Sequence, residues 1–219
     1  MPAAEPTRDR ELALLEAGAE LVIGCDEVGR GAIAGPVAVG VAVVDATTGG
    51  APAGLRDSKL LSETRREALE PAAREWARHS AVGLASPAEV DEQGIIASLG
   101  LAAVRALGEL HRGGVRFERA VVLLDGSHDW LTPALPRGAD VPRVVTQVKA
   151  DRDCAVVAAA SVIAKVHRDR LMIAAHEQAP DYGWASNKGY ASAAHYAIVD
   201  RDGAHALHRR TWLRAPELF

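Results

Sequence analysis

Short apolar runs bounded by glycine, proline or charged residues recur along the chain, and they predict β-strands. Five runs have this character: residues 21–25, 37–44, 81–85, 119–124 and 141–148. A glycine-rich turn and Pro36 separate the first two runs, which indicates an antiparallel hairpin. The strand signals therefore predict one sheet that opens with a hairpin.

Longer segments with a helical spacing of apolar residues lie between and after these runs. They predict helices over residues 8–19, 63–79, 87–112 with a break near Gly94, 153–178 and 192–200. Ser62 and Ser86 stand directly before two of these segments, where N-cap residues are favoured. The order of elements predicts an α/β fold: a five-stranded mixed sheet flanked by helices, with a helical C-terminal extension.

With 219 residues, of which 48% are hydrophobic, the chain is large enough for one domain with its own core. No apolar run approaches the roughly 20 residues that span a bilayer. Residues 1–20 contain Glu and Arg where a signal peptide is apolar, so we expect a cytoplasmic protein without a membrane partner. Cys25 and Cys154 lack the spacing of a zinc site, and we expect two buried, reduced thiols.

The formal net charge is −4, but the charge is distributed unevenly. Residues 1–136 contain 13 Lys and Arg against 20 Asp and Glu, whereas residues 137–219 contain 12 against 9. An acidic first part and a basic last part suit a site where clustered acids bind cations beside a surface that meets phosphates.

Residues 24–31, Gly-Cys-Asp-Glu-Val-Gly-Arg-Gly, place two adjacent acids directly before a glycine-rich turn. Asp26 and Glu27 supply the oxygen ligands that hard divalent cations prefer. Gly29 and Gly31 allow backbone N–H groups to approach a polyanion closely, and Arg30 adds a cation. The segment predicts a site for metal and phosphate.

Two further acids follow predicted strands, Asp125 after the fourth and Asp151 after the fifth. The carboxyl ends of strands form the ligand crevice of an open α/β sheet, so these acids can converge with Asp26 and Glu27. Clustered carboxylates repel one another unless cations neutralise them, and we predict two Mg²⁺ or Mn²⁺ ions that promote phosphoryl transfer. Singly, each acid has another interpretation: a turn residue, a helix cap or a surface partner of Arg30.

Ser161, Lys165 and Arg168 recur at i, i+4 and i+7 in the longest predicted helix and share one of its faces. This face is a candidate contact for a phosphate strand, and equally an ordinary solvated stripe. Lys188 and Tyr190 flank a glycine and offer a cation and an aromatic ring that can stack on a sugar or base. A tyrosine that packs its own loop is the alternative.

Seven segments resemble, in order, those of the bacterial ribonucleases HII, the type 2 ribonucleases H. They are residues 26–31 with 34–37, 57–59, 124–126, 149–151, 159–166 with 168–169, 188–190 and 208–209. The resemblance implies a ribonuclease H-like catalytic domain at residues 21–180, a helical lead-in at 1–20 and a helical substrate-binding extension at 181–219. It also implies a metal-dependent endonuclease that cuts the RNA strand of RNA–DNA hybrids. Such an enzyme also nicks duplex DNA 5′ of a single ribonucleotide, which leaves 3′-hydroxyl and 5′-phosphate ends.

By this resemblance, the catalytic and metal-binding acids are Asp26, Glu27, Asp125 and Asp151. The loop Gly29-Arg30-Gly31 is implied to sense the 2′-hydroxyl, and Tyr190 to sense the RNA–DNA junction. A 2′-hydroxyl both donates and accepts hydrogen bonds, which suits backbone groups that glycine leaves open. The remaining implied substrate-binding residues are Ser58, Lys59, Ser161, Lys165, Arg168 and Lys188.

Some positions depart from the family pattern. Ala150 stands where a glycine is common, Leu60 where a second lysine is common, and Asn187 where a histidine often precedes Lys-Gly-Tyr. None removes a catalytic group, so they bear on substrate grip and not on the reaction. About 20 residues precede the first strand, where type 3 relatives carry an extra domain, and this favours type 2. We expect a monomer, and no residue identifies a sliding-clamp partner.

Three other classes are alternatives. A dinucleotide-binding oxidoreductase fails on spacing, because Gly29 and Gly31 are followed by Gly35 and not by a glycine three residues on. A non-catalytic nucleic-acid-binding module would use the basic last part, but four acids would oppose its binding to phosphates. A resolvase-type nuclease with a ribonuclease H-like fold would share the metals, and the Gly29-Arg30-Gly31 loop with Tyr190 separates it from a ribonuclease HII.

Overall fold

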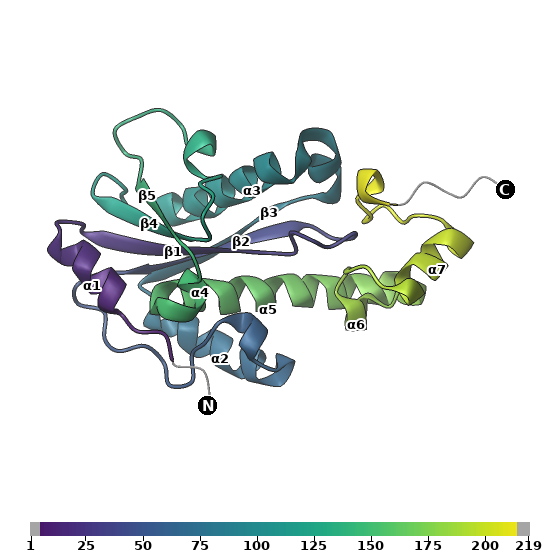
Figure 1. Ribbon diagram of the computed structural model, residues 1–219, viewed down its shortest axis with the longest axis horizontal. Coiled ribbons are helices and arrows are strands. Elements are labelled where there is room, and N and C mark those ends of the chain that lie inside the picture. Colours follow the sequence, from purple (N-terminus) through teal and green to yellow (C-terminus); the bar gives the residue numbers. More distant parts are fainter. Residues whose placement is uncertain (1–4, 214–219) are drawn as a thin grey trace.

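Five strands form one mixed sheet in the computed structural model, which describes residues 5–213 (Figure 1). They are β1 (Leu21–Val28), β2 (Val37–Val44), β3 (His79–Ala85), β4 (Ala120–Asp125) and β5 (Arg143–Gln147). Their spatial order is β3-β2-β1-β4-β5; β2 is antiparallel to both of its neighbours, and β1, β4 and β5 are parallel. The predicted α/β fold with its initial hairpin is confirmed. Residues 1–4 and 214–219, which belong to the predicted lead-in and extension, lie outside the described residues.

Helices cover both faces of the sheet (Figure 1). They are α1 (Asp9–Glu16), α2 (Glu63–Trp76), α3 (Pro87–Arg112), α4 (Ala150–Asp153), α5 (Ala155–Gln178), α6 (Trp184–Asn187) and α7 (Ala193–Asp202). α3 packs on one face and α5 on the other, with α2 against α5. α6 and α7 follow α5 past the end of the sheet where the β1–β2 turn lies (Figure 1).

Alternation along β1 directs its residues to two cores. Ile23 and Cys25 belong to the apolar cluster under α3, and the intervening Gly24 faces α5. A Cβ atom on Gly24 would lie 2.4 Å from the carbonyl carbon of Val156, so the strand and helix approach closely only because this residue is glycine. The same alternation turns Asp26, a buried residue, toward α5.

The predicted helix starts are confirmed. The Ser62 hydroxyl accepts a hydrogen bond from the Arg65 amide at 3.3 Å, and Ser86 forms a capping box with Glu89. The predicted break at Gly94 is also present, with a φ of +79° that glycine adopts readily.

Within the described part of the chain, α3 is the one helix with the length and composition of a membrane span. Leu99, Leu107 and Leu110 on this helix are buried in the core beneath the sheet. Its apolar character is that of a core helix.

Two predicted boundaries differ in ways that matter for the site. β1 continues past Cys25 to Val28 because β2 goes on pairing with it, so Asp26 and Glu27 lie within the strand and not after it. The predicted helix at 153–178 is divided, because the backbone of Cys154 is extended, with φ −116° and ψ 120°. α4 ends before this residue and α5 begins after it.

The second predicted helix is shorter than its periodicity indicated. α2 ends at Trp76, since His79 is already paired with Val43 in the sheet. Sheet pairing here overrides a helical sequence pattern.

Candidate active site

The four predicted acids lie at one edge of the sheet. β1 carries Asp26 and Glu27, β4 ends at Asp125, and α4, directly after β5, carries Asp151. These three strands are adjacent and parallel, so their carboxyl ends meet at this edge. The Asp151 amide lies 3.4 Å from Oδ1 of Asp125. The fold therefore brings together acids that are up to 125 residues apart in sequence, as Asp26 and Asp151 are.

The side chains of the four acids do not form a complete metal-binding site. Among residues 5–213, no three His, Cys, Asp or Glu side chains are grouped to hold one ion. Asp151 instead pairs with Lys59, whose Nζ lies 3.0 Å from its Oδ2. Carboxylates of like charge repel one another, and Lys59 supplies a positive charge among them.

Asp26 nevertheless has an atom suited to a cation. Its Oδ1 accepts a hydrogen bond from the Glu27 amide at 2.9 Å. Its Oδ2 is buried and has no hydrogen-bond partner in the described chain. A buried carboxylate oxygen without a partner is costly unless a proton or a cation satisfies it. This atom and the all-oxygen donor set of the four acids fit a hard divalent cation.

The electrostatics of Asp26 lead to the same conclusion. Burial, reinforced by the Glu27 carboxylate, raises the pKa of Asp26 to about 8, although Ser161 and Lys59 oppose the shift. Lys59 itself has a raised pKa: burial acts against its charge, but the carboxylates of Asp26 and Asp151 outweigh burial. At neutral pH, Asp26 therefore retains a proton that a cation would displace.

Two more acids share this behaviour. Burial raises the pKa of Glu27, with Arg30 opposing the shift and Asp125 adding to it. Burial also raises the pKa of Asp125, and the neighbouring Asp151 carboxylate adds to that shift. Perturbed carboxyl groups that cluster at the carboxyl ends of strands are characteristic of functional sites.

Arg209 holds the Gly29-Arg30-Gly31 turn from behind. Its buried guanidinium donates to the carbonyl oxygens of Gly29 at 2.7 Å, Arg30 at 3.0 Å and Gly35 at 3.2 Å. The C=O and N–H groups of a trans peptide point in opposite directions, so the amides of Arg30 and Gly31 point away from Arg209. Neither amide donates to an acceptor within residues 5–213. The turn thus presents two backbone donors.

The two glycines of this turn differ in what they require. Gly29 has a φ of +80°, and a Cβ atom on it would lie 2.0 Å from Nε of Arg168. A Cβ atom on Gly31 would meet nothing within 4 Å in the described chain. Packing therefore demands glycine at position 29, whereas no contact within residues 5–213 demands it at position 31.

Tyr190 lies beside the same turn. It forms a β-bridge with Ala32, and the amides of Ile33 and Ala34 donate to the carbonyl oxygen of Gly189. Its ring lies 5.5 Å from the guanidinium carbon of Arg168, and the residue is 37% exposed. The structure therefore brings together the predicted loop and the predicted tyrosine.

Arg168 is not part of a solvated basic face. It is fully buried and donates to the carbonyl oxygens of Pro36 at 2.9 Å, Lys188 at 2.9 Å and Ala34 at 3.1 Å. Contrary to the sequence prediction of a phosphate contact, its charge is used to position the loops that carry Gly29 and Tyr190. The periodicity of α5 could not reveal which loops pack against it.

The other members of that predicted face are also engaged. Ser161 and Ser58, both buried, share a hydrogen bond of 2.8 Å between their hydroxyl groups. Lys165 pairs with Asp169 on the next turn of α5 at 2.6 Å. These residues do not form the open stripe that the spacing predicted, because Ser161 and Arg168 are buried and Lys165 is partly buried.

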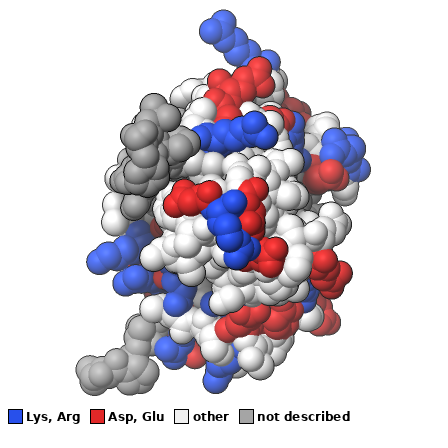
Figure 2. All heavy atoms as spheres, turned by 90° about the vertical axis from the view of Figure 1, so that its right-hand side faces the viewer, with Lys and Arg blue, Asp and Glu red and all other residues white. Residues whose placement is uncertain are grey.

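Lys188 is buried as well, and its Nζ lies 3.4 Å from a carboxylate oxygen of Glu63. Cations beside the acids that reach solvent include Arg30, with a side chain 51% exposed, and Lys59, with a side chain 62% exposed. The side chain of Arg152, next to Asp151, is also 51% exposed. At the end of the molecule formed by the C-terminal elements, basic and acidic side chains are interspersed across the surface (Figure 2).

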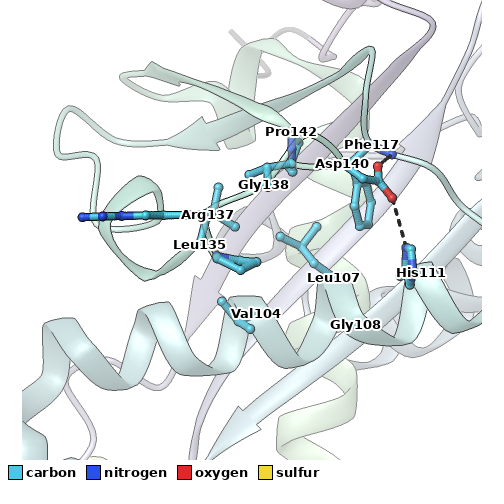
Figure 3. A pocket seen from close by; sticks show the side chains of 12 residues that line it. Val104, Leu107, Gly108, His111, Phe117, Leu135, Arg137, Gly138, Asp140 and Pro142 are labelled. Carbon is cyan, nitrogen blue, oxygen red and sulfur yellow. Dashed lines mark hydrogen bonds and ion pairs between the residues drawn. The ribbon is translucent and has the colours of Figure 1, made fainter.

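An apolar hollow of about 400 Å³ lies between α3 and the segment before β5 (Figure 3). Leu107, Phe117 and Leu135 line it, and His111 Nδ1 lies 3.5 Å from Oδ2 of Asp140 at its margin. None of the predicted site residues lines this hollow. The candidate site is therefore the open acidic edge of the sheet and not an enclosed pocket.

The sequence of this chain matches a family of known proteins. The model of the family described as Ribonuclease HII matches residues 23–215. The chain belongs to the ribonuclease HII family. The ribonuclease HII of Streptomyces griseus subsp. griseus is 46% identical over 217 residues, which are 97% of this chain and 86% of the relative. That of Paracoccus denitrificans is 40% identical, covering 94% and 91%.

Solved structures share the fold of this chain. In the PCNA:RNase HII complex from Archaeoglobus fulgidus, the matching chain is 25% identical with a TM-score of 0.63, covering 90% of this chain and 98% of that one. The Bst-RNase HIII structure in complex with Mn²⁺ shares the fold, with a TM-score of 0.70 at 23% identity, covering 94% and 71%. As a ribonuclease HII family member, the protein is a ribonuclease H, a hydrolase that acts on RNA–DNA hybrids.

Arg209 is a residue whose position sequence reasoning missed. In the sequence, Arg209 is notable only as part of the family-like pair His208-Arg209. Its contacts with the glycine turn join residues about 180 positions apart, as its bond to Gly29 shows. No local pattern encodes such a contact.

Proposed function

We propose that the protein hydrolyses the RNA strand of RNA–DNA hybrids and nicks duplex DNA 5′ of single embedded ribonucleotides, leaving 3′-hydroxyl and 5′-phosphate ends. One observation carries the proposal. The buried, unpartnered Oδ2 of Asp26 lies at the edge where the four acids meet, directly before a turn that presents the amides of Arg30 and Gly31. A candidate metal ligand and two backbone amides that can bind a sugar hydroxyl thus lie within a few residues of each other.

The acids have the composition for two ions. Asp26, Glu27, Asp125 and Asp151 would hold Mg²⁺ or Mn²⁺, ions that activate water and stabilise the leaving oxygen of an in-line displacement. Burial and mutual repulsion raise the pKa values of three of these acids, that of Asp26 to about 8, and ionisation completes the ligand set. Lys59 supplies the positive charge that stabilises the ionised carboxylates.

The turn and Tyr190 supply selectivity. The amides of Arg30 and Gly31 donate to a 2′-hydroxyl, which distinguishes RNA from DNA. Arg209 fixes their direction through the carbonyl oxygens behind them. The exposed ring of Tyr190 packs on the neighbouring deoxyribose, where a second 2′-hydroxyl would be in the way.

We place this activity in the cytoplasm, where the protein would remove misincorporated ribonucleotides during DNA replication and repair without a membrane partner. Residues 181–219 serve as a substrate-binding extension of a catalytic domain at 21–180, and the chain acts as a monomer. The archaeal relative is seen with PCNA. We assign no residue of this chain to a sliding-clamp contact.

A labelled DNA duplex with one ribonucleotide tests the proposal. We expect Mg²⁺- or Mn²⁺-dependent cleavage on the 5′ side of the ribonucleotide, while a duplex of the same sequence made only of DNA stays whole. An uncut ribonucleotide strand overturns the proposal. Equal cutting of the all-DNA duplex favours a resolvase-type nuclease instead.

A further inference from the structure

The break between α4 and α5 creates a helix start that its own segment does not cap. The extended backbone of Cys154 ends α4 and begins α5, and its side chain makes no capping hydrogen bond. The first amides of an α-helix have no partner within the helix. The amides of Val157 and Ala158 already donate to the carbonyl oxygen of Cys154. The amides of Ala155 and Val156 are therefore the ones that need an acceptor from outside the helix.

The N-terminal segment supplies both missing acceptors. The Ala155 amide donates to the carbonyl oxygen of Thr7 at 2.9 Å, and the Val156 amide donates to Oε1 of Glu11 at 2.8 Å. The Thr7 amide in turn donates to the carbonyl oxygen of Asp153 at 3.1 Å. Three hydrogen bonds from a segment about 145 residues away in sequence therefore fix the α4–α5 corner.

Glu11 is an unusual residue for this task. It is fully buried, and its Oε2 has no hydrogen-bond partner in the described chain. Burial raises its pKa, and the Val156 amide opposes the shift. A carboxylate at a helix N-terminus is favoured by the helix dipole, whereas a buried oxygen without a partner is not. The side chain therefore contributes chiefly through its bond to the start of α5.

The corner that Glu11 fixes carries a predicted metal ligand. α4 has only four residues, and so short a helix has little stability of its own. Asp151 is its second residue, held on the other side by the contact of its amide with Asp125. The position of this carboxylate thus depends on the corner that follows it.

We propose that Glu11 is a positioning residue for the metal site: by capping α5 across the chain, it sets the place of Asp151. This inference rests on the proposed function, since it assumes that Asp151 holds metal. Removal of a group that orients a metal ligand weakens metal affinity by about tenfold or more. A purely structural residue would lower stability without changing metal affinity.

Calorimetric titration of the full-length chain with Mn²⁺ tests the proposal without substrate. Glu11→Ala removes the acceptor, and we expect its dissociation constant for Mn²⁺ to rise by about tenfold. Glu11→Gln keeps an oxygen at the same reach, and we expect it to stay within about twofold of the wild type. Ser86→Ala is the matched control, because it removes the N-cap of α3, a helix that carries none of the four acids, and it should leave Mn²⁺ binding unchanged.

The outcomes separate the two proposals. A folded Glu11→Ala variant that binds Mn²⁺ as the wild type does would overturn the positioning role alone. A wild-type chain that binds no Mn²⁺ overturns the metal centre itself. If Glu11→Ala fails to fold, Glu11→Asp replaces it, since a side chain one methylene shorter cannot reach the Val156 amide. Unchanged Mn²⁺ binding in that variant counts against the role in the same way.

Discussion

Nζ of Lys59 lies 3.0 Å from Oδ2 of Asp151, so a cation of the protein itself is held among the acids of the site. Its charge also lowers the pKa values of Asp26 and Asp125, which burial raises. Lys59 therefore sets how readily these carboxyl groups ionise, and ionisation is what metal binding requires.

Substitution of Lys59 by methionine should shift the pH range of catalytic activity upward. Without the ammonium, the pKa values of Asp26 and Asp125 rise further, and the acid limb of the pH–rate profile moves upward. We expect kcat/KM at pH 7 to fall by about tenfold and to recover in part at pH 9. Arg170→Met, which removes an exposed cation paired with Glu67, is the control and should leave the profile in place. A loss of equal size at every pH would show that Lys59 acts by another route.

Without metal, the Asp26 carboxyl group should destabilise the folded protein above about pH 4. Its pKa is about 8 in the folded protein against an ordinary value of 3.8, so between these values the folded state holds a proton that the unfolded state releases. Stability without metal therefore falls as pH rises from about 4 to about 8. In urea unfolding with EDTA at pH 8, Asp26→Asn should be more stable than the wild type by about 2 kcal/mol or more. The two proteins should converge near pH 4, and a constant difference across this range would refute the assignment.

The two glycines of the turn should respond in opposite ways to alanine. Gly29→Ala introduces a Cβ atom into Arg168 at a positive φ, and we expect it to lower the free energy of unfolding by about 2 kcal/mol or more. Gly31→Ala should change stability by less than about 0.5 kcal/mol, because its Cβ atom meets nothing in the described chain. Its cleavage of a single-ribonucleotide duplex should nevertheless fall by about tenfold, because the methyl group enters the space of the sugar. Full activity of Gly31→Ala would remove the turn from substrate recognition.

Sequence patterns predicted most of the fold because the relevant signals are local. Ser62 and Ser86 cap helices whose starts could be read directly, and Gly94 breaks α3 where a glycine interrupts its pattern. The end of β1 was placed too early, because charged Asp26 and Glu27 resemble the end of an apolar strand while pairing with β2 continues.

The site was predictable to the extent that its residues follow strands. The four acids could be placed together from parallel-sheet geometry alone. The roles of Arg168 and Arg209 could not, because each is defined by carbonyl oxygens of distant loops. The same holds for Glu11, whose partner amide lies at the start of α5.

Tyr190 should matter most at an RNA–DNA junction. We expect Tyr190→Ala to reduce cleavage at a lone ribonucleotide by about tenfold more than cleavage within a continuous RNA–DNA hybrid, since only the former places a deoxyribose beneath the ring. Steady-state rates on the two labelled substrates provide the comparison. Tyr182→Ala is the control, because the Tyr182 ring stacks on that of Trp184, with ring centroids 5.1 Å apart. Equal losses on both substrates would remove the junction-sensing role.

If the strand-end acids serve catalysis by holding metal, cleavage must depend on their charge. Asp125→Asn tests this dependence most directly, because the amide keeps the shape of the side chain but loses the charged ligand. The measurement is cleavage of a single-ribonucleotide duplex in Mg²⁺, together with binding of the same duplex. We expect cleavage to fall by about a thousandfold or more, while the dissociation constant for the duplex stays within about threefold of the wild type. Near-normal cleavage by a folded Asp125→Asn variant would contradict a catalytic role of these acids.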